Sequence, residues 1–105
     1  MPYYVYVIEL ENRVRKTRKF IKANPNIDFT KPCVYVGQSV RSPEKREIQH
    51  YEGHKSSWWV REFGIQLLPK LFEIYNPLKT RKMAETAERM LTKHLRKEGY
   101  GVWSN

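Results

Sequence analysis

Hydrophobic positions along the chain cluster in short segments whose composition predicts β-strands. Residues 3–10, YYVYVIEL, are rich in β-branched and aromatic side chains, which favour a strand. Residues 33–37, CVYVG, predict a second strand that ends at its glycine. Residues 70–75, KLFEIY, alternate apolar and polar positions, as expected for a third strand, and YGVW at 100–103 is a candidate for a short terminal strand.

Two segments in the first half of the chain have the pattern of short helices. Residues 13–22 carry six basic residues and no acidic one. A helix there is expected to stop before Asn24-Pro25, because a residue that precedes proline disfavours helical angles. Ser-Pro-Glu at 42–44 is a helix start, with a capping hydroxyl, a first-turn proline and an acid near the positive helix end. This helix is expected to reach about Tyr51.

Two further helices are expected in the second half of the chain. Residues 56–64, SSWWVREFG, have a serine cap at one end and a glycine at the other. Trp58 and Trp59 in this segment point opposite ways, so one of them is expected in the core, with base stacking as the alternative role. From residue 80 to residue 98 apolar side chains recur at helical spacing, and the glycine that follows supplies the stop.

The order of these elements predicts a small α/β domain. A chain of 105 residues is the size of one hydrophobic core, so residues 1–105 are expected to form a single domain. The first two strands are expected to pair antiparallel, with a basic insertion at about residues 11–32 looping out between them. The other elements place helices against the resulting sheet.

Charge and cysteine content restrict the partners and the compartment. A formal net charge of +9 favours polyanionic partners, namely DNA, RNA or an anionic membrane surface. The single cysteine, Cys33, excludes an internal disulfide and a multi-cysteine zinc site. No apolar run is long enough to span a membrane, and the first ten residues are typical of a strand rather than of a signal peptide. A reducing, cytoplasmic location is therefore expected.

Five polar side chains fall where the predicted elements could bring them together. Tyr6 and Tyr35 lie on neighbouring strands, whereas Arg46 and His50 are four residues apart and share a helix face. Glu88 lies at the rim of the apolar stripe of the last helix, where a carboxylate needs a cation. That cation is either a protein side chain or a metal ion.

Each of these side chains also has a purely structural interpretation. Strand tyrosines often serve only to pack, and an arginine in a basic protein is usually solvated. His50 could cap the end of its helix. Glu88 could pair with a basic side chain of the same helix, the candidates being Lys82, Lys93 and Arg96.

Taken together, the motifs resemble those of the GIY-YIG nuclease superfamily. The matching segments are YVY at 4–6, YVG at 35–37, Arg46 with His50 four residues later, and ERMLTKHLRKEGYGVW at 88–103. The resemblance covers nearly the whole chain apart from residues 11–32. That superfamily includes homing endonucleases, some restriction enzymes and the incision domain of a nucleotide-excision repair nuclease. The resemblance implies a small, mainly antiparallel three-stranded sheet flanked by helices and a metal-dependent endonuclease that cuts DNA.

The resemblance also implies a role for each matched residue. Tyr6 and Tyr35 match the tyrosines of the first and second motifs, Arg46 the helix arginine, and His50 the histidine found one turn later in some members. Glu88 matches the glutamate that binds a single divalent cation, with Mg²⁺ or Mn²⁺ expected. Any one of Tyr6, Tyr35 and His50 could activate the attacking water: histidine has the more suitable intrinsic pKa, and the resemblance favours Tyr6.

The sequence departs from the family pattern in several places. Tyr4 stands where the first motif usually opens with glycine, and Tyr6 and Tyr35 are 29 positions apart, where a short turn is usual. The spacing from Tyr35 to Arg46 is one residue longer than in many members. The late asparagine of some members has no clean match: Asn105 is a candidate, although Gly101 stands nearer the aligned place.

Basic residues outside the catalytic set are candidate DNA contacts. They lie in the basic insertion and just after the helix that carries Arg46, where they could bind phosphates without reading sequence. A solvated charged face is the alternative for the insertion. The candidates are Arg13, Arg15, Lys16, Arg18, Lys19, His54 and Lys55. A non-catalytic nucleic-acid-binding module with the same scaffold is the main alternative function, and a ribosome-associated basic protein explains the charge but not the motifs.

Overall fold

Four strands form one mixed sheet in the computed structural model, which describes residues 1–104. β1 (Tyr4–Leu10) and β2 (Cys33–Ser39) pair antiparallel, as predicted. β3 (Gly64–Leu67) pairs antiparallel with the other side of β1, and β4 (Gly101–Ser104) runs parallel to β2. The order β3-β1-β2-β4 confirms the α/β class but not the predicted three-stranded, mainly antiparallel sheet. β2 also continues for two residues beyond Gly37, where it was predicted to end.

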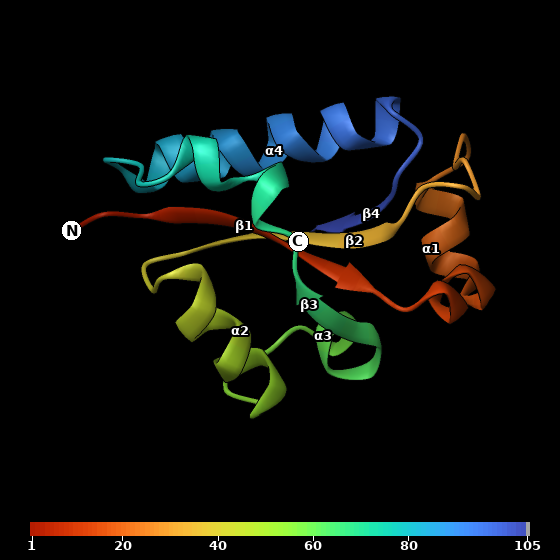
Figure 1. The fold of residues 1–105 in the computed structure, drawn as a ribbon, viewed down its shortest axis with the longest axis horizontal. Coiled ribbons are helices and arrows are strands. Elements are labelled where there is room, and N and C mark those ends of the chain that lie inside the picture. Colours follow the sequence, from red (N-terminus) through yellow and green to blue (C-terminus); the bar gives the residue numbers. More distant parts are fainter. Residues whose placement is uncertain (105) are drawn as a thin grey trace.

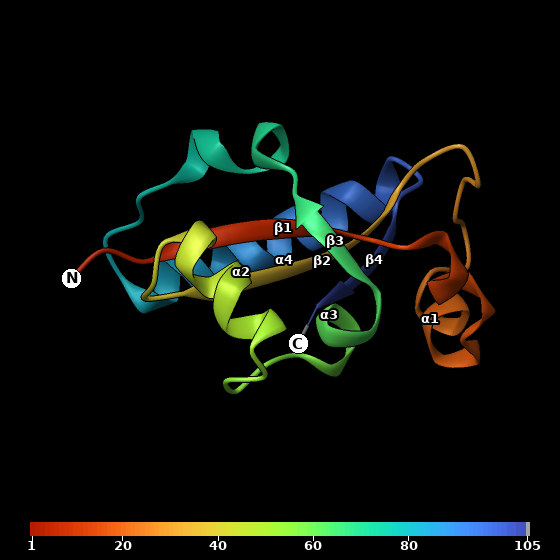
Figure 2. The ribbon, with the colours of Figure 1, turned by 60° about the horizontal axis from the view of Figure 1, so that its bottom comes forward.

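Helices cover both faces of the sheet (Figure 1). The long helix α4 (Arg81–Lys97) lies on one face, and α2 (Pro43–Tyr51) with α3 (Trp58–Phe63) lies on the other. The 3₁₀ turn η1 (Asn12–Lys16) and helix α1 (Arg18–Ala23) form the basic insertion at one end of the sheet. Figure 2 shows the same layers from the α2 side, with the strands between that helix and α4.

Strand alternation divides the side chains of the sheet between these two layers. Successive residues of a strand point to opposite faces. Tyr6 and Tyr35 contact His50 of α2, so they point toward the α2–α3 layer. The intervening valines point toward α4 and are completely buried, which applies to Val5, Val7, Val34 and Val36. Apolar core lies on both faces of the sheet, whereas Tyr6, Tyr35 and His50 lie on the α2 side and Glu88 on α4.

The helix boundaries follow the capping signals of the sequence. Ser42 accepts a hydrogen bond from the Lys45 amide at the start of α2, and Thr80 accepts one from Met83 at the start of α4. Gly99, just beyond α4, has φ of +96°, a conformation that glycine adopts without strain. These three features confirm the predicted ends of both helices.

The predicted third strand at residues 70–75 is wrong. That segment forms parts of two 3₁₀ turns, η2 (Pro69–Leu71) and η3 (Glu73–Tyr75). Only Phe72 at 2% exposure is buried there, whereas Ile74 is 83% exposed, so the alternating pattern does not mark a buried face. The strand that completes this edge is β3, which directly follows α3.

The predicted helix at residues 13–22 is interrupted at Thr17, whose backbone is extended. Val14 and Phe20 are both fully buried. Six residues of continuous α-helix would separate their directions by about 120°, so the two side chains would not point at the same part of the core. The break at Thr17 lets both side chains reach the core, and α1 ends just before Asn24-Pro25, as predicted.

The two Asn-Pro sequences place their asparagines against the sheet backbone. The Asn24 amide accepts a hydrogen bond from the Val102 N–H at 2.8 Å and donates to the Val102 carbonyl at 3.0 Å. Asn76 pairs with Val5 in the same way, at 2.9 and 2.8 Å. Each asparagine thus satisfies backbone groups that a further strand would otherwise bind. Cys33 is buried and free, and residues 1–104 contain no helix that is long and apolar enough to cross a membrane.

Candidate active site

The phenol of Tyr6 lies directly over Gly37 of the neighbouring strand. The two residues are paired in the β1–β2 ladder, and a Cβ atom on Gly37 would lie 2.5 Å from Tyr6 Cζ and overlap the hydroxyl. Tyr35, two residues earlier on the same face, has its ring centroid 6.2 Å from that of Tyr6. The missing side chain of Gly37 therefore lets the two phenols lie together. In the sequence this glycine predicts a strand end and completes the YVG motif, and neither feature predicts its role in holding the phenols together.

His50 is buried between α2 and the two phenols. Its Nδ1 accepts a hydrogen bond from the Ser57 backbone N–H at 3.0 Å, and its Nε2 lies 2.7 Å from Tyr6 Oη. Burial, followed by the positive charge of Arg46, lowers the pKa of His50 to about 4, so the ring is neutral at pH 7. Because Nδ1 is an acceptor, the single ring proton resides on Nε2 and is donated to Tyr6. His50 is thus a hydrogen-bond donor to Tyr6 rather than a cap of its helix.

Arg46 is held in place by the turn between α2 and α3. Its Nη1 donates to Gln49 Oε1 at 3.2 Å and to the His54 carbonyl at 3.1 Å, and its Nη2 donates to the Lys55 carbonyl at 2.8 Å. These bonds fix the guanidinium near Tyr6 and make it more than a solvated charge. The sequence predicted a role for the side chains of His54 and Lys55. The structure instead uses their backbone carbonyls, which no residue type signals. Both side chains are exposed.

Glu88 contributes a carboxylate without a cationic partner. The only ion pairs among residues 1–104 are Glu11 with Arg13 and His94 with Glu98, so pairing of Glu88 with a helix lysine or arginine is not observed. Burial, followed by repulsion from Glu85, raises the pKa of Glu88 to about 7. The charge of Arg89 lowers this pKa only in part, without forming an ion pair. A half-buried carboxylate outside any ion pair fits the donor that a divalent cation requires.

The charge of Glu88 reaches both phenols, although α4 lies on the other face of the sheet. Burial raises the pKa of Tyr35, and the negative charge of Glu88 raises it further. The pKa of Tyr6 is raised by burial and by Tyr35, and also by Glu88, against the lowering effect of Arg46. β4 pairs with β2 only as far as Val36, so among the described strands β2 has a free edge beyond that point. Glu88 therefore belongs to the same electrostatic group as the tyrosines and the arginine.

Access to this group is uneven. Tyr6 and Tyr35 are each only 1% exposed, whereas Arg46 and Glu88 are half-buried. Arg46 and Glu88 are therefore the members of this set that solvent reaches directly. No group of three or more histidine, cysteine, aspartate or glutamate side chains that could hold a metal is found within residues 1–104. A cation here would have one protein carboxylate, with water and substrate oxygens completing its coordination.

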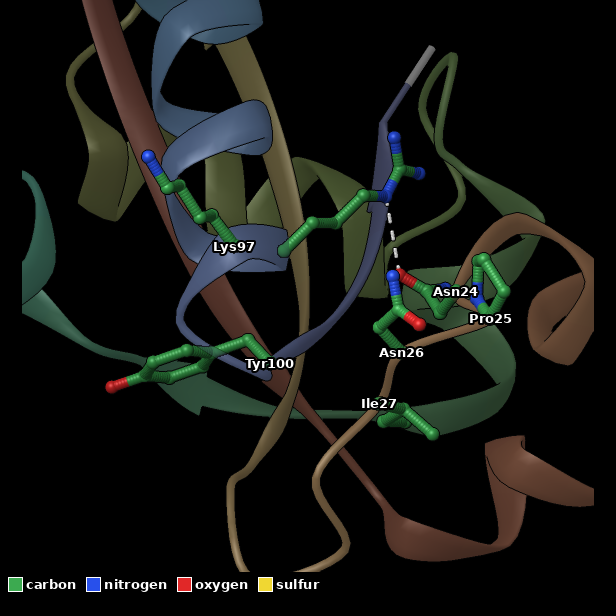
Figure 3. Close-up of a pocket in the computed structure, with 7 residues that line it drawn as sticks. Asn24, Pro25, Asn26, Ile27, Lys97 and Tyr100 are labelled. Carbon is green, nitrogen blue, oxygen red and sulfur yellow. Dashed lines mark hydrogen bonds between the residues drawn. The ribbon is translucent and has the colours of Figure 1, made fainter.

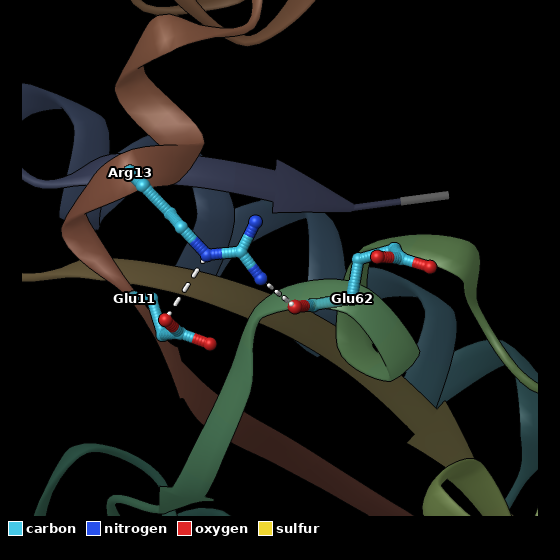
Figure 4. A network of polar contacts seen from close by, with 3 residues as sticks. All are labelled: Glu11, Arg13 and Glu62. Carbon is cyan, nitrogen blue, oxygen red and sulfur yellow. Dashed lines mark hydrogen bonds and ion pairs between the residues drawn. The ribbon is translucent and has the colours of Figure 1, made fainter.

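The predicted DNA contacts of the basic insertion are partly used within the protein. Arg13 donates to Glu11 at 3.1 Å and to the Glu62 carbonyl at 2.7 Å (Figure 4), and its guanidinium lies 4.6 Å from the Phe63 ring centroid. Arg15 donates to the Lys31 carbonyl at 2.5 Å. Contacts of this kind hold the insertion against the domain.

The remaining basic side chains of the insertion are more available. Lys16 and Arg18 are exposed, and Lys19, also exposed, has its ammonium 5.9 Å from the Trp103 ring centroid. Lys16 and Arg18 are therefore the clearest candidates in this segment for a contact with phosphate, and such a contact stays a prediction.

The tryptophan pair divides between core and surface, as the sequence predicts. Trp59 is 8% exposed and has its ring centroid 4.4 Å from that of Trp103, whereas Trp58 is 47% exposed. Asn105, the candidate for the late asparagine of the family pattern, lies outside the described residues.

No protein family, curated protein or solved structure matches this chain. The resemblance to the GIY-YIG superfamily therefore depends on the motifs themselves. What the structure adds is the arrangement of the residues that carry them.

Proposed function

We propose that this protein is a GIY-YIG-type endonuclease that hydrolyses DNA phosphodiester bonds with the help of one divalent cation. The observation that carries the proposal is the grouping of Tyr6, Tyr35, Arg46, His50 and Glu88, which come from four separate segments and interact through hydrogen bonds and charge. Packing alone does not require an arginine, a neutral histidine and an unpaired carboxylate around two phenols. The net charge of +9 supports a nucleic-acid substrate.

Arg46 and Glu88 have complementary tasks at the scissile phosphate. The guanidinium, fixed by the carbonyls of residues 54 and 55, donates to the nonbridging oxygens and stabilises the charge that develops on them. Glu88 is the residue that holds the cation, with Mg²⁺ expected and Mn²⁺ as the alternative. When bound, the cation supplies Lewis-acid stabilisation of the leaving oxygen.

Tyr6 is the best-placed acceptor for the proton of the attacking water. Its oxygen receives a hydrogen bond from His50 Nε2 and also interacts with Arg46, and both contacts stabilise the phenolate over the phenol. His50 cannot take up this proton in the same arrangement, because its Nε2 already carries one and its Nδ1 is bound to Ser57. His50 is therefore a positioning residue for Tyr6.

A non-catalytic nucleic-acid-binding module is the second candidate. The 1% exposure of Tyr6 and Tyr35 favours it, because a water molecule has little access to either phenol in this conformation. Such a module would bind DNA with strong salt dependence. Its affinity would be indifferent to divalent metal and to the identity of residue 88.

Nicking of a supercoiled plasmid tests the proposed function. The parent protein is expected to cut with Mg²⁺ or Mn²⁺ and to be inactive in EDTA. Arg46→Ala is expected to lower the rate by roughly 10²- to 10³-fold, the usual cost of removing a preorganised donor to the developing charge. Arg41→Ala is the matched control, since Arg41 is an exposed arginine in the turn before α2, and it should cut like the parent.

Equal cutting by the parent and both arginine variants would contradict the proposal. The activity would then come from a contaminant or from another site. Thermal melting of each variant establishes that a loss of cutting is not a loss of folding.

A further inference from the structure

A cavity of about 290 Å³ lies between α4 and β4, outside the candidate active site. Its lining contains three cationic side chains and two hydroxyl side chains, and no acidic residue: Arg89, Thr92, Lys93, Arg96 and Ser104. The cations follow one another along α4 at intervals of four and three residues, so they share one side of the helix.

This cavity adjoins the candidate active site along two elements. Thr92 lies one helical turn after Glu88, a rise of about 6 Å along the axis of α4. Ser104 pairs with Val36 at the end of the β2–β4 ladder, next to Gly37, which lies under Tyr6. A nucleic-acid strand bound at Glu88 would therefore extend past this cavity.

None of the cations of the cavity is paired with a carboxylate among the described residues, although Arg89 donates a hydrogen bond to Thr86 Oγ1 at 3.3 Å. Thr92 is only 5% exposed, and its Oγ1 has no hydrogen-bond partner among the described residues. Leaving a buried hydroxyl unbonded costs free energy, so such a group is expected to have a partner in the functional state.

Arg96, at the rim of the cavity, is held by hydrogen bonds to the segment after α1 and to β4. Its Nε donates to Asn24 Oδ1 at 3.1 Å and its Nη2 donates to the Val102 carbonyl at 2.9 Å. Arg96 also lines a neighbouring pocket. Figure 3 shows Asn24, Lys97 and Tyr100 around that pocket. The guanidinium is thus held without a carboxylate, in the way that suits an anion arriving from outside.

We propose that this cavity binds a second backbone phosphate of the DNA strand that is cut. This inference rests on the proposed function, because it assumes that the strand passes Glu88. A strand of duplex DNA presents a phosphate about every 3.4 Å along the helix axis, so a phosphate near the scissile one falls within reach of a site about one helical turn from Glu88. Arg89, Lys93 and Arg96 supply the charge, and Thr92 and Ser104 are the available hydroxyl donors.

Binding of a fluorescently labelled DNA duplex, measured by anisotropy in EDTA so that no cleavage occurs, tests this site. The double variant Arg89→Gln/Lys93→Gln is expected to bind roughly tenfold more weakly at low salt. The slope of log affinity against log salt should fall by about one for each phosphate contact that is lost. Arg96 is left unchanged, because its hydrogen bonds also hold β4. Lys70→Gln is a control that removes one positive charge elsewhere, at an exposed lysine that follows β3 on the opposite sheet edge, and it should retain the parent affinity and slope.

Plasmid nicking by the same proteins separates this inference from the proposed function. If the double variant binds as tightly as Lys70→Gln with the same salt slope, the second phosphate site is refuted, whether or not the parent protein cuts DNA. If the double variant binds more weakly and the parent does not cut under any metal condition, the cavity stands as a DNA contact and the nuclease proposal fails. Arg89 and Lys93 are exposed, so the variants are expected to melt like the parent.

Discussion

Replacing Glu88 by glutamine is expected to abolish DNA cleavage while making the free protein more stable at pH 8. The amide cannot supply the anionic oxygen that holds a divalent cation, and loss of metal stabilisation worth several kcal/mol corresponds to a rate at least about a thousandfold lower. Single-turnover cleavage of a plasmid at saturating Mg²⁺ measures this effect. Glu73→Gln is the control, an exposed glutamate of η3 away from the candidate site that should cut like the parent.

The gain in stability follows from the raised pKa of Glu88. Burial raises this pKa to about 7 from an ordinary value of 4.5, so the folded protein holds a proton that the unfolded chain releases between these values. Stability therefore falls as the pH rises through that window, and the destabilisation persists above pH 7. Glutamine removes this effect. After allowance for solvent screening we expect a gain of about 1 kcal/mol at pH 8, or roughly 4 to 8 °C in Tm for a domain of this size.

Melting curves at two pH values isolate the charge of Glu88. At pH 4 the carboxyl is protonated in the folded protein, so Glu88→Gln and the parent should melt together. At pH 8 the variant should melt higher. If Glu88→Gln melted below the parent at pH 8, the carboxylate would have a stabilising partner in the free protein, and its assignment as the cation ligand would be wrong.

Replacing Tyr6 by phenylalanine is expected to lower the cleavage rate by roughly 10²- to 10³-fold and to change its pH dependence. A general base contributes only in its deprotonated form, and burial raises the pKa of Tyr6 above its ordinary value. The rate of the parent should therefore rise about tenfold for each pH unit from 6 to 9. His50, with a pKa of about 4, is already deprotonated throughout this range, so a histidine base would give a flat profile.

Single-turnover rates across pH 6 to 9, with parent, Tyr6→Phe and Tyr35→Phe, distinguish the candidate bases. Tyr35→Phe is the closest matched variant, because it removes a buried hydroxyl from the same pair of rings. It is expected to slow the reaction and to keep the rise with pH. A flat profile in the parent, or parent-like rates in Tyr6→Phe, would exclude Tyr6 as the base.

Much of the fold was predictable because its signals are local. Capping residues set the ends of α2 and α4, and the β-branched segments became β1 and β2. β3 was missed because residues 64–67 are partly exposed, with Ile65 at 48%, and show no buried alternation. The chain leaves α3 beside the free edge of β1 at Ile8, Glu9 and Leu10, and it pairs with that edge. The strand therefore depends on a tertiary contact and not on its own sequence pattern.

The candidate site was predictable as a set of residues but not as a network. Motif spacing pointed to Tyr6, Tyr35, Arg46, His50 and Glu88. The structure places Tyr6, Tyr35 and His50 in contact, and Arg46 and Glu88 act on the phenols through their charges. The contacts that orient them come from positions with no sequence signal of their own: the Ser57 amide on His50, the carbonyls of residues 54 and 55 on Arg46, and the open space over Gly37. The amide and the carbonyls belong to the backbone, which all residue types share, so the sequence does not mark which of them will bind a side chain.

Anomalous diffraction from crystals of the Tyr6→Phe protein with Mn²⁺ and a DNA duplex tests the central claim most directly. A single manganese peak is predicted against the Glu88 carboxylate, with one phosphate of the duplex between it and the guanidinium of Arg46. A duplex bound to another face of the protein, with manganese absent from Glu88, would contradict the assignment of these residues to phosphodiester hydrolysis.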